Sequence, residues 1–416
     1  MSEKKQRCSR RNFLKITGAA GVGSAIVSFG RFAGAQDSAL KQVPTRPFGK
    51  TGQQVSMLSF GGSQNLSSKQ LLLRQAIKMG VTYWDTAASY SGGKSEEAMG
   101  KYLAKYPDDR KNIFLVSKAH TSDPYQLSLS LKQSLERLKT DYVDLYFVHG
   151  VRNAKEELTE AVKTWAEKAK AEGKIRFMGF STHRHMERNL MEGAKLGWID
   201  GIMSTYNYRL MNTDDMKRAV EACAKAGIGL TAMKTQAKFF ARFYSDIGNE
   251  NDVAAVLADR FIQKGFTPEQ AKLKVVWENP QIASICSEMT NMTILQANVA
   301  AALDQTELSL QDRQLLEGYA QVSAPGYCAG CGNVCESVLN ADVPISDIMR
   351  YLMYHDEYGN QKQAMQLYND LPEQVHRRLV STDYAKAEMR CPQKMPITRL
   401  MHRAAEKLSG DGTTKA

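Results

Sequence analysis

Four residues able to carry out acid–base chemistry follow three consecutive apolar segments of the chain. Asp85 and Tyr90 come after residues 81–84, Lys118 ends the next such segment, and His149 directly follows the third. An aspartate can hold a lysine ammonium, and a cation beside a tyrosine lowers the pKa of its phenol. A histidine can donate a hydrogen bond to a carbonyl oxygen. The set would suit donation of a proton to a carbonyl as a hydride arrives, although each residue alone is usually structural.

Short apolar segments and longer helical segments alternate over most of the chain and would position these residues. The helical segments carry apolar residues at i, i+3 and i+4, as at Leu127, Leu131 and Leu138. Strands are expected at 55–60, 81–84, 113–117, 143–148, 175–180, 201–204, 227–232 and 282–285. Helices are expected at 69–78, 96–105, 124–138, 154–171, 187–196, 214–226, 268–279 and 293–303.

This alternation predicts an α/β fold, a closed (β/α)8 TIM barrel, on whose C-terminal face the polar residues would meet. A doubly wound sheet is the alternative. It needs a glycine-rich fingerprint after the first strand, which Gly61-Gly62-Ser63 does not supply.

Three further regions surround the expected barrel. We expect a signal peptide at 1–35, the barrel at 36–305, a connecting helix at 306–322 and a small all-α iron–sulfur domain at 323–416. The loop 235–266 is too long for an ordinary βα connection, so it is expected either to cover the site or to be a surface insertion. In the tail, a helix over 396–408 would present one apolar face.

Ordered motifs make the region up to about residue 302 similar to the aldo/keto reductase family. They are FGKTG at 48–52 with GG at 61–62, DTA at 85–87 with SE at 95–96, DYVDLY at 141–146 before His149, and GKIR at 173–176 with GFS at 179–181. The resemblance implies Tyr90 as general acid/base and Lys118 as the partner that lowers its pKa. It also implies that Asp85 holds Lys118 and that His149 orients the carbonyl of a small carbonyl or alcohol substrate.

The resemblance also implies positions for a nicotinamide cofactor. Ser181 and Asn207 match the family, whereas its carboxamide-binding glutamine would fall near Met203 and its stacking aromatic near Met233. Residues 285–289 stand where the family's phosphate-binding loop is expected, and Asn298 is a further cofactor position. From 282 to 298 there is no Lys or Arg to hold a 2′-phosphate. NAD(P) is therefore one candidate source of electrons. The alternative is that electrons pass through a cluster, or that a nucleotide is trapped during folding.

Four tail cysteines have a spacing that resembles iron–sulfur ligation in ferredoxin-like modules. They are Cys328, Cys331, Cys335 and Cys391, the last followed by Pro392. A branch of the aldo/keto reductases carries such a tail, and four ligands would hold one [4Fe–4S] cluster. Structural zinc and disulfides are the alternatives. Cys223 and Cys286 are expected to be ordinary small apolar residues.

The first 35 residues have the order of an export signal. Arg10 and Arg11 lie in a segment resembling the twin-arginine motif, and an apolar stretch and Ala33-Gly34-Ala35 follow it. We expect recognition by the Tat translocase, export to the periplasm or beyond, and no stable membrane anchor. These residues contribute +6 of the formal charge of +11, so no basic face for nucleic acid remains.

Together these features predict an exported iron–sulfur oxidoreductase that interconverts a carbonyl and an alcohol, with a redox partner protein as one expected partner. Two alternatives stay open. One is an electron-transfer or binding protein in which the barrel is not an NAD(P)-dependent reductase. The other is a barrel whose cluster only stabilises the tail.

Overall fold

The computed structural model describes residues 41–236 and 250–410. The expected signal at 1–35 and the residues 237–249 of the long loop lie outside the described residues. In the described part, no helix is both long and apolar enough to cross a membrane.

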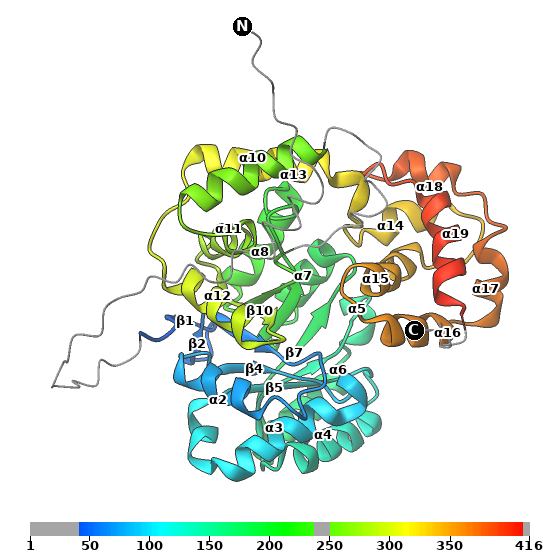
Figure 1. The fold of residues 1–416 in the computed structure, drawn as a ribbon. Helices are drawn as coiled ribbons and strands as arrows, with labels where there is room; N and C mark the ends of the chain where they lie inside the picture. Colours follow the sequence, from blue (N-terminus) through cyan, green and yellow to red (C-terminus); the bar gives the residue numbers. More distant parts are fainter. Residues whose placement is uncertain (1–40, 237–249, 411–416) are drawn as a thin grey trace, which may run out of the picture. The chain divides into compact units, whose positions relative to one another are not determined.

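Eight parallel strands close into a barrel, which confirms the predicted TIM barrel (Figure 1). The strands are β3 (Leu58–Gly61), β4 (Tyr83–Asp85), β5 (Phe114–Ala119), β6 (Val143–Val148), β7 (Ile175–Thr182), β8 (Gly201–Thr205), β9 (Gly229–Met233) and β10 (Ile282–Glu288). Pairing of β10 with β3, in which Ile285 lies opposite Leu58, closes the ring. All the strand ends that carry the expected catalytic residues therefore meet on one face.

The first expected strand, 55–60, is divided in the structure. Its beginning belongs to β2 (Gln54–Ser56), which pairs antiparallel with β1 (Thr45–Pro47), and only β3 enters the barrel. The Ser56 hydroxyl donates to the Leu58 carbonyl and so stabilises the turn between the two strands. Phe48, which follows β1, packs inside the barrel at 5.3 Å from the Phe114 ring. The segment after β1 thus supplies a side chain that fills part of the barrel interior.

Helices surround the barrel in the expected order. They are α2 (Gln70–Lys78), α3 (Lys94–Lys105), α4 (Pro124–Leu138), α5 (Ala154–Glu157), α6 (Glu160–Ala171), α7 (Met186–Lys195), α8 (Asp214–Lys225), α11 (Pro268–Trp277) and α12 (Met292–Leu303). The helix expected over 154–171 is divided into α5 and α6, because Leu158 and Thr159 leave the helical conformation. The apolar face of α4 is buried at Leu127, Leu131 and Leu138, as the periodicity predicts.

Part of the long loop forms a helix that contacts the segment after the barrel. It is α10 (Glu250–Gln263), which lies beside α13 (Leu310–Val322). Asp312 and Ser309 form a capping box at the start of α13, and Asp312 also pairs with Arg260 at 2.6 Å and with Lys264. These contacts attach α10 to α13. Whether the loop covers the site stays a prediction.

The tail is all-α among its described residues, as predicted. Its helices are α14 (Gly332–Cys335), α15 (Ile345–Asp356), α16 (Gln361–Asn369), α17 (Glu373–Leu379), α18 (Ala385–Arg390) and α19 (Ile397–Leu408). The expected apolar face of α19 is buried at Ile397, Leu400, Met401, Ala404 and Leu408. This face packs into a second core separate from that of the barrel. In Figure 1, α14 and α15 lie between the barrel and the other tail helices.

Candidate active site

Three of the four expected catalytic residues contact one another at the ends of β4 and β5. The Lys118 ammonium lies 2.6 Å from Asp85 Oδ1, donates to the Thr86 carbonyl at 2.8 Å, and lies 3.4 Å from the Tyr90 hydroxyl. Asp85 and Lys118 are buried, at 2% and 1% exposure, whereas Tyr90 keeps partial contact with solvent. The buried ion pair therefore presents a cation to an accessible phenol.

His149 joins this group from the end of β6. Its ring lies 5.5 Å from that of Tyr90, centroid to centroid, in an edge-to-face arrangement. It also stacks on His120 at 3.8 Å. His149 Nδ1 is buried without a hydrogen-bond partner among the described residues, so this imidazole retains bonding capacity. The structure thus brings together all four residues that the sequence singles out.

The electrostatics of the site differ from the expectation at one point. Burial and the nearby Asp85 carboxylate raise the pKa of Tyr90 well above the usual value, whereas Lys118 was expected to lower it. Burial of the phenol is the main cause of the raised pKa, and the Asp85 carboxylate adds to it; Lys118 lies 3.4 Å from the phenol and is itself paired with Asp85 at 2.6 Å. Burial and the neighbouring His120 lower the pKa of His149 well below 6.5. At neutral pH the site therefore presents a protonated phenol and a neutral imidazole.

Three of the five expected cofactor positions lie on the neighbouring strands β7, β8 and β9, where Ser181 is the direct register partner of Met203. Ser181 is buried on β7 and its hydroxyl oxygen accepts from the Gly150 amide at 3.1 Å. Met203 lies in the apolar interior of the barrel, and Met233 packs against that interior from β9. Asn298 lies on α12 and donates to Ser287 Oγ at 3.0 Å.

Asn207 has its side-chain amide already bonded within the protein. Its Nδ2 donates to the Tyr327 hydroxyl at 2.9 Å and to the Lys234 carbonyl at 3.2 Å. Its Oδ1 accepts from the Arg209 amide at 3.0 Å. Tyr327 directly precedes the first tail cysteine, so Asn207 connects the barrel with the tail.

Several residues near the site were not expected from the sequence. Cys286 was expected to be an ordinary apolar residue, but it lies beside Asp85, where burial and that carboxylate raise the pKa of its thiol. Lys234 directly follows β9. A lysine just after an expected barrel strand indicates a residue on the C-terminal face, so the sequence alone could have singled it out. Arg350 and Tyr354 come from α15 in the tail. No sequence pattern indicates that α15 lies near the barrel face.

The four tail cysteines line one cavity, together with Pro392 and Met349 among other residues. They are free thiols, and no three His, Cys, Asp or Glu side chains in the described part are close enough to hold a single metal ion. Burial and neighbouring thiols raise the pKa of Cys331 to about 11, and burial and Glu336 raise that of Cys335 to about 12. Cys335 and Cys391 are buried and Cys328 and Cys331 are half-buried. The chemistry of these side chains fits an iron–sulfur cluster, because thiolates are its usual ligands.

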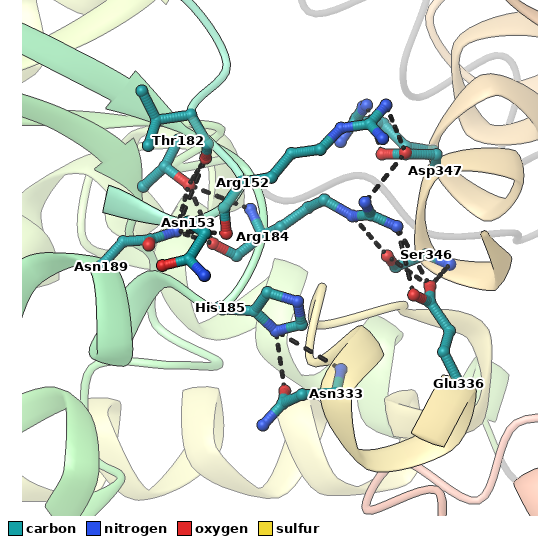
Figure 2. A network of polar contacts seen from close by, with 12 residues as sticks. Arg152, Asn153, Thr182, Arg184, His185, Asn189, Asn333, Glu336, Ser346 and Asp347 are labelled. Atoms are coloured by element: carbon teal, nitrogen blue, oxygen red, sulfur yellow. Dashed lines mark hydrogen bonds and ion pairs between the residues drawn. The ribbon is translucent and has the colours of Figure 1, made fainter. Parts of the chain in front are cut away.

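A network of arginines and acids joins this tail to the barrel (Figure 2). Arg184, from the loop after β7, lies 3.2 Å from Asp347 Oδ2 and 3.2 Å from Glu336. Arg152 also reaches Asp347 at 3.2 Å, and Arg350 reaches it at 2.8 Å. Asp347 on α15 is 0% exposed. The tail is therefore attached through buried charges at the C-terminal face of the barrel.

The structure is a closed parallel barrel with Asp, Tyr, Lys and His at the ends of its strands. This is the arrangement that the sequence motifs similar to those of the aldo/keto reductases imply. The model of the aldo/keto reductase family matches residues 56–315. The chain therefore belongs to this family and is an oxidoreductase.

Curated relatives cover the barrel region. The chain is 22% identical to L-galactose dehydrogenase of Arabidopsis thaliana over 67% of this chain and 94% of the relative. It is 28% identical to the (1S)-1,7-diacetoxy-luvungin A aldo-keto reductase of Citrus sinensis, over 67% of this chain and 90% of the relative. It is 31% identical to the aldo-keto reductase yakc [NADP(+)] of Schizosaccharomyces pombe, over 33% of this chain and 45% of the relative.

Solved structures agree with the fold. The thermostable aldo-keto reductase Tm1743, solved with the inhibitor epalrestat, superposes with a TM-score of 0.53 and 26% identity. That similarity covers 66% of this chain and 99% of the other. The similarity thus extends over almost the whole of the solved reductase but over two thirds of this chain.

Proposed function

We propose that the protein is an exported iron–sulfur oxidoreductase that interconverts a small carbonyl compound and its alcohol. The observation that carries the proposal is the contact of Lys118 with both Asp85 and Tyr90, beside His149. In the reducing direction a hydride adds to the carbonyl carbon and the Tyr90 hydroxyl gives its proton to the oxygen. The raised pKa of Tyr90 keeps that proton in place at neutral pH.

The other residues would orient and stabilise the reacting group. The lowered pKa of His149 keeps its ring uncharged, and the one N–H of the neutral imidazole can donate to the carbonyl oxygen. Lys118 would stabilise the phenolate that forms when Tyr90 has lost its proton, and Asp85 holds the ammonium in place. The chain itself thus provides the proton, the hydrogen bond and the compensating charge.

A nicotinamide nucleotide, when bound, supplies the hydride. Use of NADP(H) is consistent with the family, and Ser181 retains a hydroxyl proton that could be donated to the carboxamide. Asn207 fits less well, since its amide is bonded to Tyr327 and to the Lys234 carbonyl. That observation weakens the contact to any nucleotide and so favours a second candidate, in which electrons reach the site through the cluster.

We also propose that Cys328, Cys331, Cys335 and Cys391 hold one [4Fe–4S] cluster, supported by the cavity that they share. Protein purified without oxygen should contain about four iron and four sulfide per chain. The variant C391S should lose iron and visible absorption, while C223S, which alters a buried cysteine far along the sequence from the tail, should keep both. Stoichiometric zinc or two disulfides would contradict the assignment.

Export through the twin-arginine route is part of the same proposal and rests on the sequence alone. Replacing Arg10 and Arg11 together by lysine should retain the protein in the cytoplasm. Unchanged export of that variant would exclude this route.

The reductase activity itself is tested by product analysis. Wild-type protein with its cluster content determined is incubated with NADPH or NADH and a panel of aldehydes and ketones. We expect stoichiometric appearance of alcohol with loss of reduced nucleotide. Alcohol formed only when an electron donor to the cluster replaces the nucleotide would favour the second candidate.

A further inference from the structure

A tyrosine of the tail and a lysine of the barrel meet at the catalytic face. Lys234, directly after β9, donates to the Tyr354 hydroxyl at 3.1 Å. Its ammonium also lies 4.4 Å from the centroid of the Tyr354 ring and 5.2 Å from that of Tyr358. Lys234 comes from the end of the strand next to β8, so it faces the same opening as the catalytic residues. Figure 1 shows α15, which carries Tyr354, beside the barrel.

Lys234 has no acidic partner within the described residues. Its ammonium contacts the phenol and the two rings, whereas Arg350, Arg184 and Lys118 are all paired with carboxylates. It also has a φ of 55°, in the left-handed region, which a residue with a side chain rarely adopts. Such a conformation persists only where the surrounding structure enforces it, and it is concentrated at functional sites. A strained, half-buried cation without a counter-ion can bind an anion.

The pair is close to the catalytic group. Burial and the Asp85 carboxylate are the main causes of the raised pKa of Tyr90, and the Tyr354 phenol also contributes to it. Tyr90, Lys234 and Tyr354 are all partly exposed, so none of the three is closed off from a ligand. The oxygen of Tyr354 accepts from Lys234, which leaves the phenolic proton free to bond an anionic oxygen.

We propose that Lys234 and Tyr354 form an anion-binding subsite beside Tyr90, and that the substrate is a carbonyl compound, or its alcohol, bearing a carboxylate or comparable oxyanion. The inference rests on the proposed function, because it extends the same site. The ammonium would bind the anion by charge and the phenol would fix its direction. The tail would then complete the substrate site by supplying Tyr354.

The experiment uses full-length holoprotein and two probes, levulinate and its methyl ester, which share the ketone and differ in the charge and one methyl group of the carboxyl end. Calorimetry measures binding, and steady-state kinetics measures turnover. Wild-type protein should bind levulinate more tightly than the ester. In K234M, levulinate affinity and kcat/KM should fall about 10- to 100-fold, the range for a lost charge-assisted hydrogen bond, with the ester changed less than about threefold. Y354F, which retains the ring, should show a smaller loss of the same selectivity.

Two controls separate this subsite from a structural link. K168M removes an exposed lysine on α6 and should leave the binding of both probes unchanged. Thermal unfolding shows whether K234M is folded, and if it is not, Y354F decides the outcome. Equal affinity of the wild-type protein for the two probes, no levulinate binding at millimolar concentration, or unchanged selectivity in the folded variants would overturn the proposal. Selective binding without turnover would refute the reductase function but support the subsite.

Discussion

Replacing Asp347 by asparagine tests how the tail is held on the barrel. The substitution keeps the size of the side chain and removes one charge from a fully buried position between arginines. Arg184 and Arg350 are 9% and 19% exposed in their side chains, so little water can replace the lost charge. Arg152 is 61% exposed and its contact is expected to contribute little.

The expected loss of stability depends on which charges the substitution leaves unpaired. Removing one partner of a buried ion pair costs about 3–5 kcal/mol, because the other charge remains buried. Arg184 keeps Glu336 as a second partner, so we expect the lower end, about 3 kcal/mol. With a urea dependence of about 2 kcal/mol per molar, the transition of the tail should move down by about 1.5 M.

The four tryptophans make the assay specific. Trp84, Trp165, Trp198 and Trp277 all lie in the barrel region, so their fluorescence follows the barrel, whereas circular dichroism also follows the tail helices. In D347N the circular dichroism signal should begin to fall at lower urea than the fluorescence. The control D342N alters an exposed tail acid and should not change either curve. Superimposed curves with a shift below about 0.3 M in D347N would refute this reasoning.

Two further substitutions test charges in the barrel region. K118M should lower carbonyl turnover by at least about 100-fold and reduce stability, because it leaves the Asp85 carboxylate buried without its cation; unchanged turnover at full folding would contradict the role of Lys118. Burial alone would raise the pKa of Asp312, but hydrogen bonds from Lys264, Ser309 and Arg260 outweigh it and lower the pKa. A depressed folded-state pKa contributes stability above the unfolded value of about 4 that is lost as pH falls. Denaturation of D312N should therefore show lower stability than wild type at pH 7 and a smaller loss between pH 5 and pH 3; parallel pH profiles would contradict this.

The barrel and its four central residues could be predicted because their signals are local. Each apolar strand segment is followed by its polar residue, and parallel strands place such residues on one face. The position of Met203 inside the barrel also follows from its place in a strand. The division of residues 55–60 could not be predicted, because one apolar run spans both β2 and β3 and only the pairing with β1 separates them.

The contribution of the tail to the barrel face depends on contacts between residues distant in sequence. Tyr354 lies 120 positions from Lys234, and nothing in the pattern around either residue indicates the contact. The raised pKa of Tyr90 likewise depends on burial and on the nearby Asp85 carboxylate, which are properties of the folded site.

The most direct test of the account is the turnover of Y90F with a carbonyl substrate of the wild-type protein. Y90F retains the ring and removes the only proton that the account places on the carbonyl oxygen. Y125F, which alters a tyrosine with 67% exposure, is the matched control. We predict that Y90F loses about 100- to 10,000-fold in kcat with substrate affinity nearly unchanged, and that Y125F behaves as wild type. Normal kcat in Y90F would contradict the account.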